Sequence, residues 1–233
     1  MIVDKSKIIV ALDYPNEESA LLFVEKLDPS LCRLKIGKEL FTRSGPSIIK
    51  SFVNDGFDVF LDLKYHDIPN TVANACKAAA DLGVWMVNVH AMGGQKMLEA
   101  ARESLDGPDA PILISVTLLT SSGEKELAAL GIQQTTKEFV QRLANMTQKA
   151  GLDGIVCSAH EASDIKRQYG SDFICVTPGI RLENDSTDDQ QRIMTPVNAL
   201  KSGSDYLVIG RSITNAADPC KVLRTINSDI TGL

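Results

Sequence analysis

The chain has 233 residues, of which 44% are hydrophobic and 23% charged, and it carries a net charge of -6 at pH 7 with a pI near 5.1. A chain of this size can bury a large core, and we expect one domain over residues 1–233. The acidic balance argues against a general nucleic-acid or membrane-surface binder, which needs a concentrated basic face. Any bound anion must therefore be held by a few local cations.

The cysteines and the apolar runs predict a soluble, cytoplasmic protein. Five cysteines are scattered along the chain without a C-x-x-C pair, so neither a zinc site nor a disulfide framework is indicated. The apolar run Ile8–Leu12 is too short for a signal-peptide core, and no other run approaches the length of a membrane span. We therefore expect no membrane partner and no nucleic-acid partner.

Eight short runs of β-branched and aliphatic residues predict strands. They are Ile8–Leu12, Cys32–Ile36, Val59–Leu63, Met86–His90, Ile112–Thr117, Gly154–Cys157, Phe173–Thr177 and Tyr206–Ile209. Most of these runs are apolar on both faces, which is typical of parallel strands covered by helices.

Segments with helical spacing separate the strands. The first follows Pro15, with Asn16 as its expected N-cap and Glu17 and Glu18 in its first turn. The others are expected over Pro46–Val53, Asn70–Leu82, Gly94–Leu105, Lys137–Ala150, His160–Tyr169, Pro196–Ser202 and a stretch after Pro219. This alternation predicts an α/β fold of the (β/α)8 TIM barrel type. The alternative is an open doubly wound sheet, which normally has fewer strands and often a glycine-rich first turn that is absent here.

Two connections are longer and more polar than the rest. Thr120–Gln134 includes a short expected helix over Lys125–Leu130, and Arg181–Arg192 is rich in Asp, Asn, Ser and Gln. Both follow strands of the predicted barrel, on the face where such barrels place their sites. Long polar connections in a compact domain are often lids, and we expect that role for both.

A charged cluster is predicted where the first three strands end. Asp13 follows the first strand, Lys35 closes the second, and Asp62, Lys64 and Asp67 lie at or after the end of the third. Side chains alternate along a strand, so Asp62 and Lys64 share a face. Taken alone, they could be an ordinary surface ion pair. In a barrel the five side chains can meet, and carboxylates nearby keep a lysine protonated, which makes Lys64 a positioned acid.

The loops after the last two strands predict a phosphate site. Barrels often bind phosphate there, through backbone N–H groups and a nearby cation. Gly210 allows close approach of the backbone, and Arg211 offers a donor fork suited to phosphate. Arg181 and Gln190, from the preceding long connection, are expected to close over it.

Six segments of the chain resemble those of a known family. They are Ile9–Asp13, Leu34–Gly37, Phe60–Thr71, Val116–Ser121, Thr177–Arg181 and Val208–Ile213. With the motif D-x-K-x-x-D-I-P-N-T, the chain resembles the orotidine 5'-phosphate decarboxylases of the shorter bacterial type. The resemblance implies a homodimer that converts orotidine 5'-phosphate to UMP and carbon dioxide, the last step of UMP biosynthesis. It also implies that neither a metal nor an organic cofactor takes part.

The resemblance implies a role for each matching residue. Lys64 would donate a proton to pyrimidine C6, Asp62 would face the departing carboxylate, and Lys35 and the partner subunit's Asp67 would complete the charge network. The substrate would be held by Asp13, Lys35 and the partner's Thr71 at the ribose, by Thr120 and Pro178 along the pocket, and by Arg181, Gln190, Gly210 and Arg211 at the phosphate.

Two other functions are compatible with parts of this pattern. A 3-keto-gulonate 6-phosphate decarboxylase uses magnesium, but it expects an acidic ligand where this chain has Lys35, whose ammonium repels a divalent cation. An inert phosphate-binding barrel would retain Gly210 and Arg211 without needing the charged cluster. Two residues of the fourth predicted strand are left unassigned: Asn88 could touch the site or orient a lysine, and His90 could line the pocket or make a structural hydrogen bond.

Overall fold

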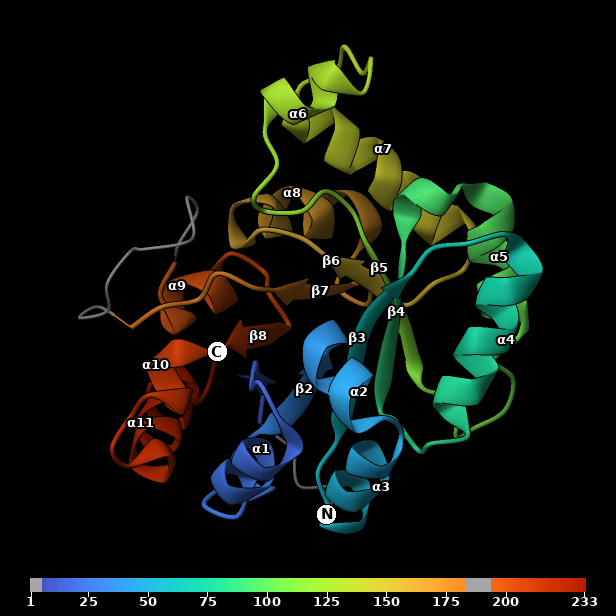
Figure 1. Cartoon of the computed structure of the whole chain (residues 1–233). Helices are drawn as coiled ribbons and strands as arrows, with labels where there is room; N and C mark the ends of the chain where they lie inside the picture. The colour runs from blue at the N-terminus through green and yellow to red at the C-terminus, as the bar shows by residue number, and fades with distance from the viewer. Residues whose placement is uncertain (1–5, 183–193) are drawn as a thin grey trace.

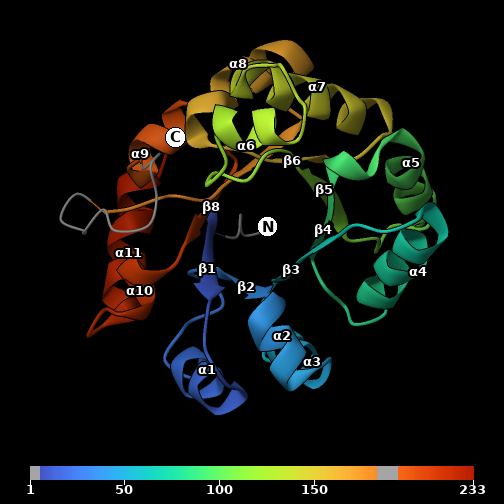
Figure 2. The ribbon, with the colours of Figure 1, turned by 45° about the horizontal axis from the view of Figure 1, so that its top comes forward.

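The computed structural model describes residues 6–182 and 194–233 (Figure 1). In these residues, eight parallel strands pair in chain order and close into a barrel, with β8 beside β1. Figure 2 shows the helices arranged around the outside of the strands. The fold is therefore the (β/α)8 TIM barrel that the sequence predicts, rather than an open sheet.

The strands follow the predicted apolar runs closely. Their bounds are β1 (Ile8–Leu12), β2 (Arg33–Gly37), β3 (Val59–Tyr65), β4 (Met86–His90), β5 (Ile112–Val116), β6 (Gly154–Val156), β7 (Ile174–Thr177) and β8 (Tyr206–Ile209). The largest departure is at β3, which continues past Leu63 to Tyr65. That extension depends on pairing, because Tyr65 reaches Val89 of β4 only after a shift in register.

Most helices lie where helical spacing predicts them, with ends moved by one or two residues. These are α1 (Glu17–Val24), α3 (Ser47–Asn54), α4 (Pro69–Ala80), α5 (Gln95–Glu103), α6 (Glu124–Ala129), α7 (Thr136–Lys149), α8 (Ala159–Tyr169), α9 (Pro196–Lys201) and α11 (Pro219–Ile230). Asn16 is the N-cap of α1, as predicted, and its side chain accepts a hydrogen bond from the N–H of Ser19. No helix in the described ranges is long and apolar enough to cross a membrane.

Three short elements have no counterpart in the sequence prediction. They are α2 (Lys38–Ser44), η1 (Ala91–Gly93) and α10 (Arg211–Thr214). Each begins within two residues of the end of a strand and is only one or two turns long, which is too short for a helical period to be visible. Two of them follow expected site residues: α2 comes after the strand that contains Lys35, and α10 comes after Gly210.

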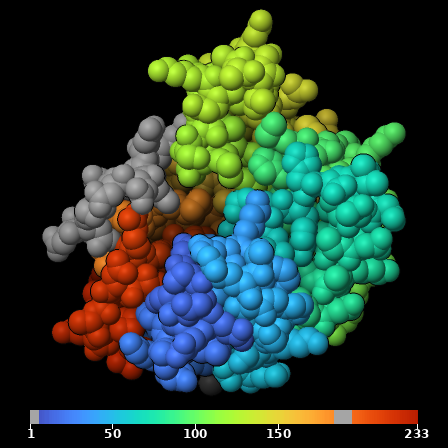
Figure 3. Space-filling model, in the orientation of Figure 1, coloured from blue at the N-terminus to red at the C-terminus, as the bar shows by residue number. Residues whose placement is uncertain are grey.

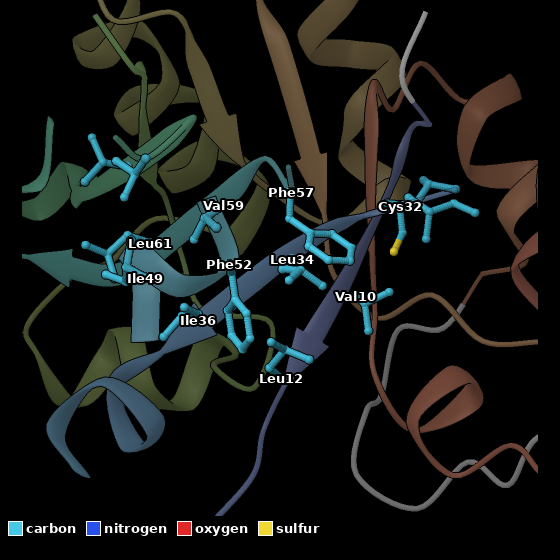
Figure 4. Packing of buried hydrophobic residues seen from close by; sticks show 14 of the residues in the cluster. Val10, Leu12, Cys32, Leu34, Ile36, Ile49, Phe52, Phe57, Val59 and Leu61 are labelled. Atoms are coloured by element: carbon cyan, nitrogen blue, oxygen red, sulfur yellow. The ribbon is translucent and has the colours of Figure 1, made fainter. Parts of the chain in front are cut away.

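The hydrophobic core has an outer layer, between strands and helices, and an inner layer within the barrel. Figure 4 shows part of the outer layer, where outward side chains of β1–β3 pack with α3; the labelled residues include Val10, Leu12, Leu34, Ile36, Val59, Leu61, Ile49 and Phe52. Full burial of such a side chain contributes about 1.5–3 kcal/mol. A separate inner cluster includes Ile9, Phe60, Met86, Ile114 and Val176.

The amino end of the barrel is closed by a cation and two aromatic rings. The Arg33 guanidinium lies 4.5 Å from the ring centroid of Trp85 and 5.1 Å from that of Tyr206. Its Nε is 3.2 Å from Asp58 Oδ2, and its Nη1 also donates to the carbonyl of Ser6. Trp85 and Tyr206 meet edge to face, with centroids 5.0 Å apart. Packing and pairing therefore satisfy the buried charge at this end.

Candidate active site

At the carboxyl end of the barrel, four charged side chains from the first three strands form a continuous chain. Asp62 Oδ1 is 2.6 Å from Lys64 Nζ, and Asp62 Oδ2 is 3.4 Å from Lys35 Nζ. Lys35 Nζ is also 3.5 Å from Asp13 Oδ1. Asp13 is largely exposed, whereas Asp62 and Lys35 are buried. The structure thus brings together Asp13, Lys35, Asp62 and Lys64.

Asp62 is held in its ionised form. Burial raises the pKa of its carboxyl, but the charges of Lys35 and Lys64 and the hydrogen bonds from Lys64 and Asn88 outweigh burial and keep that pKa below its ordinary value. Asp62 is therefore a fixed negative charge between the side chains of Lys35 and Lys64.

The backbone at Lys64 is unusual. Its φ is 53°, and in residues 6–182 and 194–233 it is the one non-glycine residue with a positive φ. This left-handed conformation costs a residue with a side chain about 1–2 kcal/mol, so its neighbours must stabilise it. The register between β3 and β4 shifts at the same place, between Leu61 and Tyr65. The lysine therefore projects from a bulge in the strand.

Asn88 is a site residue to which the sequence analysis assigns no role. Its side chain is completely buried. Nδ2 donates to Asp62 Oδ1 at 2.7 Å, and Oδ1 accepts the backbone N–H of Lys64 at 2.8 Å. The signal was an amide within the apolar β4 sequence Met86-Val87-Asn88-Val89, because a buried amide needs hydrogen-bond partners.

Asp67 does not join the cluster within one chain, so the sequence expectation that all five charged side chains meet there is wrong for this residue. Asp67 is exposed, and its carboxylate accepts the N–H of Ile68 at 2.6 Å. Among the described residues, no ion pair links it to the other four. The physical reason is that the chain leaves the barrel after Tyr65 and enters α4 at Pro69. Thr71, on the first turn of α4, is exposed as well.

A cavity of about 210 Å³ adjoins Lys64 and is mainly apolar. Its lining residues are Lys35, Phe60, Asp62, Lys64, Val116, Leu118, Leu119, Thr120, Ser121, Val156, Cys157, Pro178 and Val208. Two predicted substrate contacts, Thr120 and Pro178, are among them. The Lys64 ammonium thus lies at the wall of a mainly apolar pocket.

A second hollow, of about 460 Å³, lies beside the first and is more polar. It is lined by Ala11, Asp13, Lys35, Pro178, Gly179, Arg181, Val208, Gly210 and Arg211. Because both hollows share Lys35, Pro178 and Val208, they are parts of one cleft. In Figure 3 the surface is hollowed between the blue amino-terminal segments and the yellow-green segment around α6.

The cationic end of the cleft contains most of the predicted phosphate ligands. Gly210 is the N-cap of α10, and Arg211 is its first residue. Arg181 lies after β7 and donates to the carbonyl of Ile180 at 3.3 Å. Gln190 lies outside the described residues, as does most of the connection from Arg181 to Arg192. The expected contact of Gln190 with phosphate and the expected lid role of this connection therefore stay predictions.

The connection after β5 packs through α6 against η1 and α7. Its buried Leu127 belongs to a small apolar cluster with Ala91, Phe139 and Leu143. Leu119 and Thr120, which precede the helix, line the apolar cavity. The helix predicted near Lys125 is therefore present, and the residues that lead into it line the pocket.

His90 lies near the cleft but is not among the residues that line it. Its ring stacks on His66 with centroids 5.6 Å apart, and its Nδ1 accepts the N–H of Met92 at 3.4 Å. Burial, together with the nearby His66, Lys38 and Lys64, lowers the pKa of His90 to about 4. The imidazole is therefore neutral and serves as a hydrogen-bond acceptor.

A comparison with protein families identifies a match over residues 6–226, to the orotidine 5'-phosphate decarboxylase / HUMPS family. The chain belongs to this family. The matched range contains all the strands of the barrel and the four charged residues at its carboxyl end.

Relatives within the orotidine 5'-phosphate decarboxylase family match over nearly their whole length. The orotidine 5'-phosphate decarboxylase of Escherichia fergusonii is 57% identical, over 99% of this chain and 95% of its own. That of Chromobacterium violaceum is 59% identical, over 97% and 92%. The crystal structure of orotidine 5'-phosphate decarboxylase from Lactobacillus acidophilus superimposes with a TM-score of 0.87 at 38% identity, covering 98% of this chain and 100% of that one.

The geometry allows general acid chemistry inside the family's barrel. An ammonium held by a carboxylate at the wall of an apolar cavity can stabilise negative charge that develops there and then deliver a proton. The neighbouring cationic hollow can bind an anionic group of the same ligand. The cleft therefore suits a ligand with a ring at its apolar end and an anionic group at its cationic end.

Proposed function

We propose that this protein is an orotidine 5'-phosphate decarboxylase, which converts orotidine 5'-phosphate to UMP and carbon dioxide in the last step of de novo UMP biosynthesis. One observation carries the proposal: the Lys64 ammonium lies 2.6 Å from the buried Asp62 carboxylate at the wall of an apolar cavity. The cationic hollow beside it supports a phosphorylated substrate. Relatives named for this activity, more than half identical to the chain, support the same reading. The whole chain, residues 1–233, would be one decarboxylase domain.

In the proposed mechanism, Lys64 protonates the carbon that loses carbon dioxide. Decarboxylation leaves a carbanion at pyrimidine C6, and a fixed ammonium stabilises the charge as it forms and then supplies the proton. Asp62 would face the departing carboxylate and destabilise it; this accelerates the reaction only because the charge disperses in the transition state. Lys35 holds Asp62 from the other side, at 3.4 Å.

We propose that the reaction needs neither a metal nor an organic cofactor. The Lys64 ammonium would supply both the stabilising charge and the proton. Lys35 lies between Asp13 and Asp62, at 3.5 Å and 3.4 Å, where its charge repels any divalent cation that approaches those carboxylates. This is the physical difference from a magnesium-dependent sugar-phosphate decarboxylase.

Substrate binding would use the remaining residues of the cleft. Asp13 and Lys35 would hold ribose hydroxyls, Thr120 and Pro178 would contact the substrate along the pocket, and phosphate would be bound by Arg181, Gln190, Gly210 and Arg211. These phosphate contacts are remote from the reacting carbon. Their binding energy would hold the pyrimidine against Asp62 and close the loops over it.

We infer a cytoplasmic homodimer in which the partner subunit's Asp67 and the partner's Thr71 complete each site. In this chain both residues are exposed; Asp67 precedes α4, and Thr71 lies in its first turn. Exposed apolar side chains accompany them: Ile68 is 67% exposed and Met92 40%. The segments that carry these two side chains are neighbours, since His66 stacks on His90. Such a patch is suited to burial against a second copy.

The test is the ultraviolet absorbance of orotidine 5'-phosphate incubated with purified protein, with and without excess EDTA. Rapid conversion to UMP that EDTA does not affect is the expected result. Conversion that EDTA abolishes would contradict the role given to Lys35. Absence of conversion would favour the magnesium-dependent sugar-phosphate reaction or an inert phosphate-binding barrel.

A further inference from the structure

We propose that Asn88 is a positioning residue: its amide fixes the Asp62 carboxylate and the Lys64 backbone relative to each other. The inference rests on the proposed function, because the proton donor that Asn88 positions is Lys64. The two contacts are short, 2.7 Å from Nδ2 to Asp62 Oδ1 and 2.8 Å from the Lys64 N–H to Oδ1. One rigid side chain therefore bridges the two functional residues.

The pairing of β3 with β4 explains why an amide is needed at this place. Leu61 pairs with Val87, and the next pair is Tyr65 with Val89. Asn88 is thus the single β4 residue opposite the three residues Asp62, Leu63 and Lys64. A β-bulge disrupts the hydrogen bonds of the ladder locally, and the Asn88 side chain supplies an acceptor for the N–H of Lys64.

The orientation of the amide follows from its partners. A carboxylate only accepts and a backbone N–H only donates, so the NH₂ group must face Asp62 and the oxygen must face Lys64. No other uncharged side chain of this size offers a donor and an acceptor at those two points. Leucine has neither group, and aspartate has the acceptor for Lys64 but donates to Asp62 only when protonated.

Asn88 also acts where the strand is strained. Lys64 has a φ of 53°, a conformation that persists only when surrounding contacts hold it. Asp62 Oδ1 accepts from both Lys64 Nζ and Asn88 Nδ2, at 2.6 Å and 2.7 Å. Without the amide, the backbone at Lys64 and the carboxylate of Asp62 lose a common anchor. The ammonium is then displaced from the position at which it meets the substrate carbon.

The first test is the Asn88→Leu variant, assayed by conversion of orotidine 5'-phosphate. Misplacing a catalytic group by about 1 Å can lower a rate about 100-fold, and we expect a fall in kcat of that order. KM should change by less than about threefold, because the hydrogen bonds of the Asn88 side chain go to Asp62 and Lys64 and to none of the expected phosphate or ribose ligands. The control is Ser115→Ala. Ser115 lies on the neighbouring strand β5, and its equally buried side chain is hydrogen-bonded to Thr147 on α7. The kcat of this control should equal that of the wild type.

The second test is the pH profile of Asn88→Asp, which preserves the size of the side chain. The charged and titratable groups around the new carboxyl are Asp62 and Lys64 on β3, Lys35 on β2, Asp13 after β1 and His90 on β4. Two carboxyls in one site resist ionising together. When protonated, the new group donates to Asp62 as the amide does; when ionised, it repels Asp62. The kcat of this variant should therefore fall as pH rises, relative to the wild type.

The outcomes separate this inference from the proposed function. If wild-type protein converts the substrate while Asn88→Leu retains kcat within about threefold, positioning by Asn88 is wrong. A pH profile of Asn88→Asp parallel to that of the wild type contradicts it too, and this variant is decisive if Asn88→Leu fails to fold. A loss in Ser115→Ala as large as in Asn88→Leu would also overturn it. Inactive wild-type protein would instead refute the proposed function.

Discussion

Each end of the barrel contains a buried cation from strand β2, and the two cations have different surroundings. Arg33 and Lys35 are two residues apart and point into the barrel, and they are only 7% and 9% exposed. Arg33 is covered by Trp85 and Tyr206 and paired with Asp58. Lys35 has no aromatic cover in the described structure and lies between two carboxylates at the edge of a cleft.

The difference shows how one strand can serve both stability and chemistry. At the amino end, large rings fill the space around the charge, so nothing is left for a ligand. At the carboxyl end, the charges are balanced by one another, and a cavity of about 210 Å³ remains beside them. We therefore expect changes at the amino end to alter stability, and changes at the carboxyl end to alter turnover.

The largest effect is expected for Lys64→Ala. Removal of the proton donor should lower kcat by about 10⁴-fold or more, because general acid catalysis and charge stabilisation are lost together. Binding of UMP, measured by calorimetry, should change far less. Lys50→Ala, an exposed lysine on α3, is the matched control and should behave as the wild type. Near-normal turnover by folded Lys64→Ala would rule out the mechanism.

At the opposite end, Arg33→Ala should destabilise the fold without altering chemistry. The substitution removes the cation from two aromatic faces and leaves the Asp58 carboxylate without that partner, at a cost of about 3 kcal/mol. Urea unfolding measures the loss. The kcat of the folded variant should match the wild type at a temperature where both are native. A large fall in kcat without a fall in stability would contradict the assignment of the amino end to stability and the carboxyl end to turnover.

Arg211→Ala should weaken substrate binding at the carboxyl end. Loss of a charge-assisted hydrogen bond of about 1.5–3 kcal/mol predicts a KM raised about tenfold to 100-fold, while kcat falls less. Steady-state kinetics give both values. Arg43→Ala, an exposed arginine on α2 paired only with Glu39 among the described contacts, is the control. Equal KM values for the two variants would remove Arg211 from the phosphate site.

The smallest effect concerns the pH dependence of stability through His90, whose pKa is lowered to about 4 from an ordinary value of 6.5. His90 binds a proton more tightly in the unfolded chain than in the folded protein. Its contribution to the free energy of unfolding is therefore complete above pH 6.5 and is lost as the pH falls towards 4. After allowance for solvent screening, we expect about 1 kcal/mol. Urea unfolding of wild-type protein and His90→Gln over this pH range measures it. Parallel curves for the two proteins would contradict the prediction.

The sequence predicts the barrel because the signals for it are local. Apolar runs on both faces mark parallel strands, and the segments between them show helical spacing. The rule that sites lie at the carboxyl ends of strands then selects Asp13, Lys35, Asp62 and Lys64. The same local rule misassigned Asp67 to the cluster within one chain. It could not know that the chain turns away from the barrel after Tyr65.

By itself, then, the sequence determined the order of strands and helices, the strand ends that carry charge, and the family. The tertiary structure decided the shift in register opposite Asn88, the positive φ of Lys64, and the separate surroundings of Arg33 and Lys35. The physical reason is that strand period and polarity are properties of neighbouring residues. A hydrogen bond from Asn88 to Asp62, or a ring from Trp85 over Arg33, joins residues more than twenty positions apart and exists only once the barrel has closed.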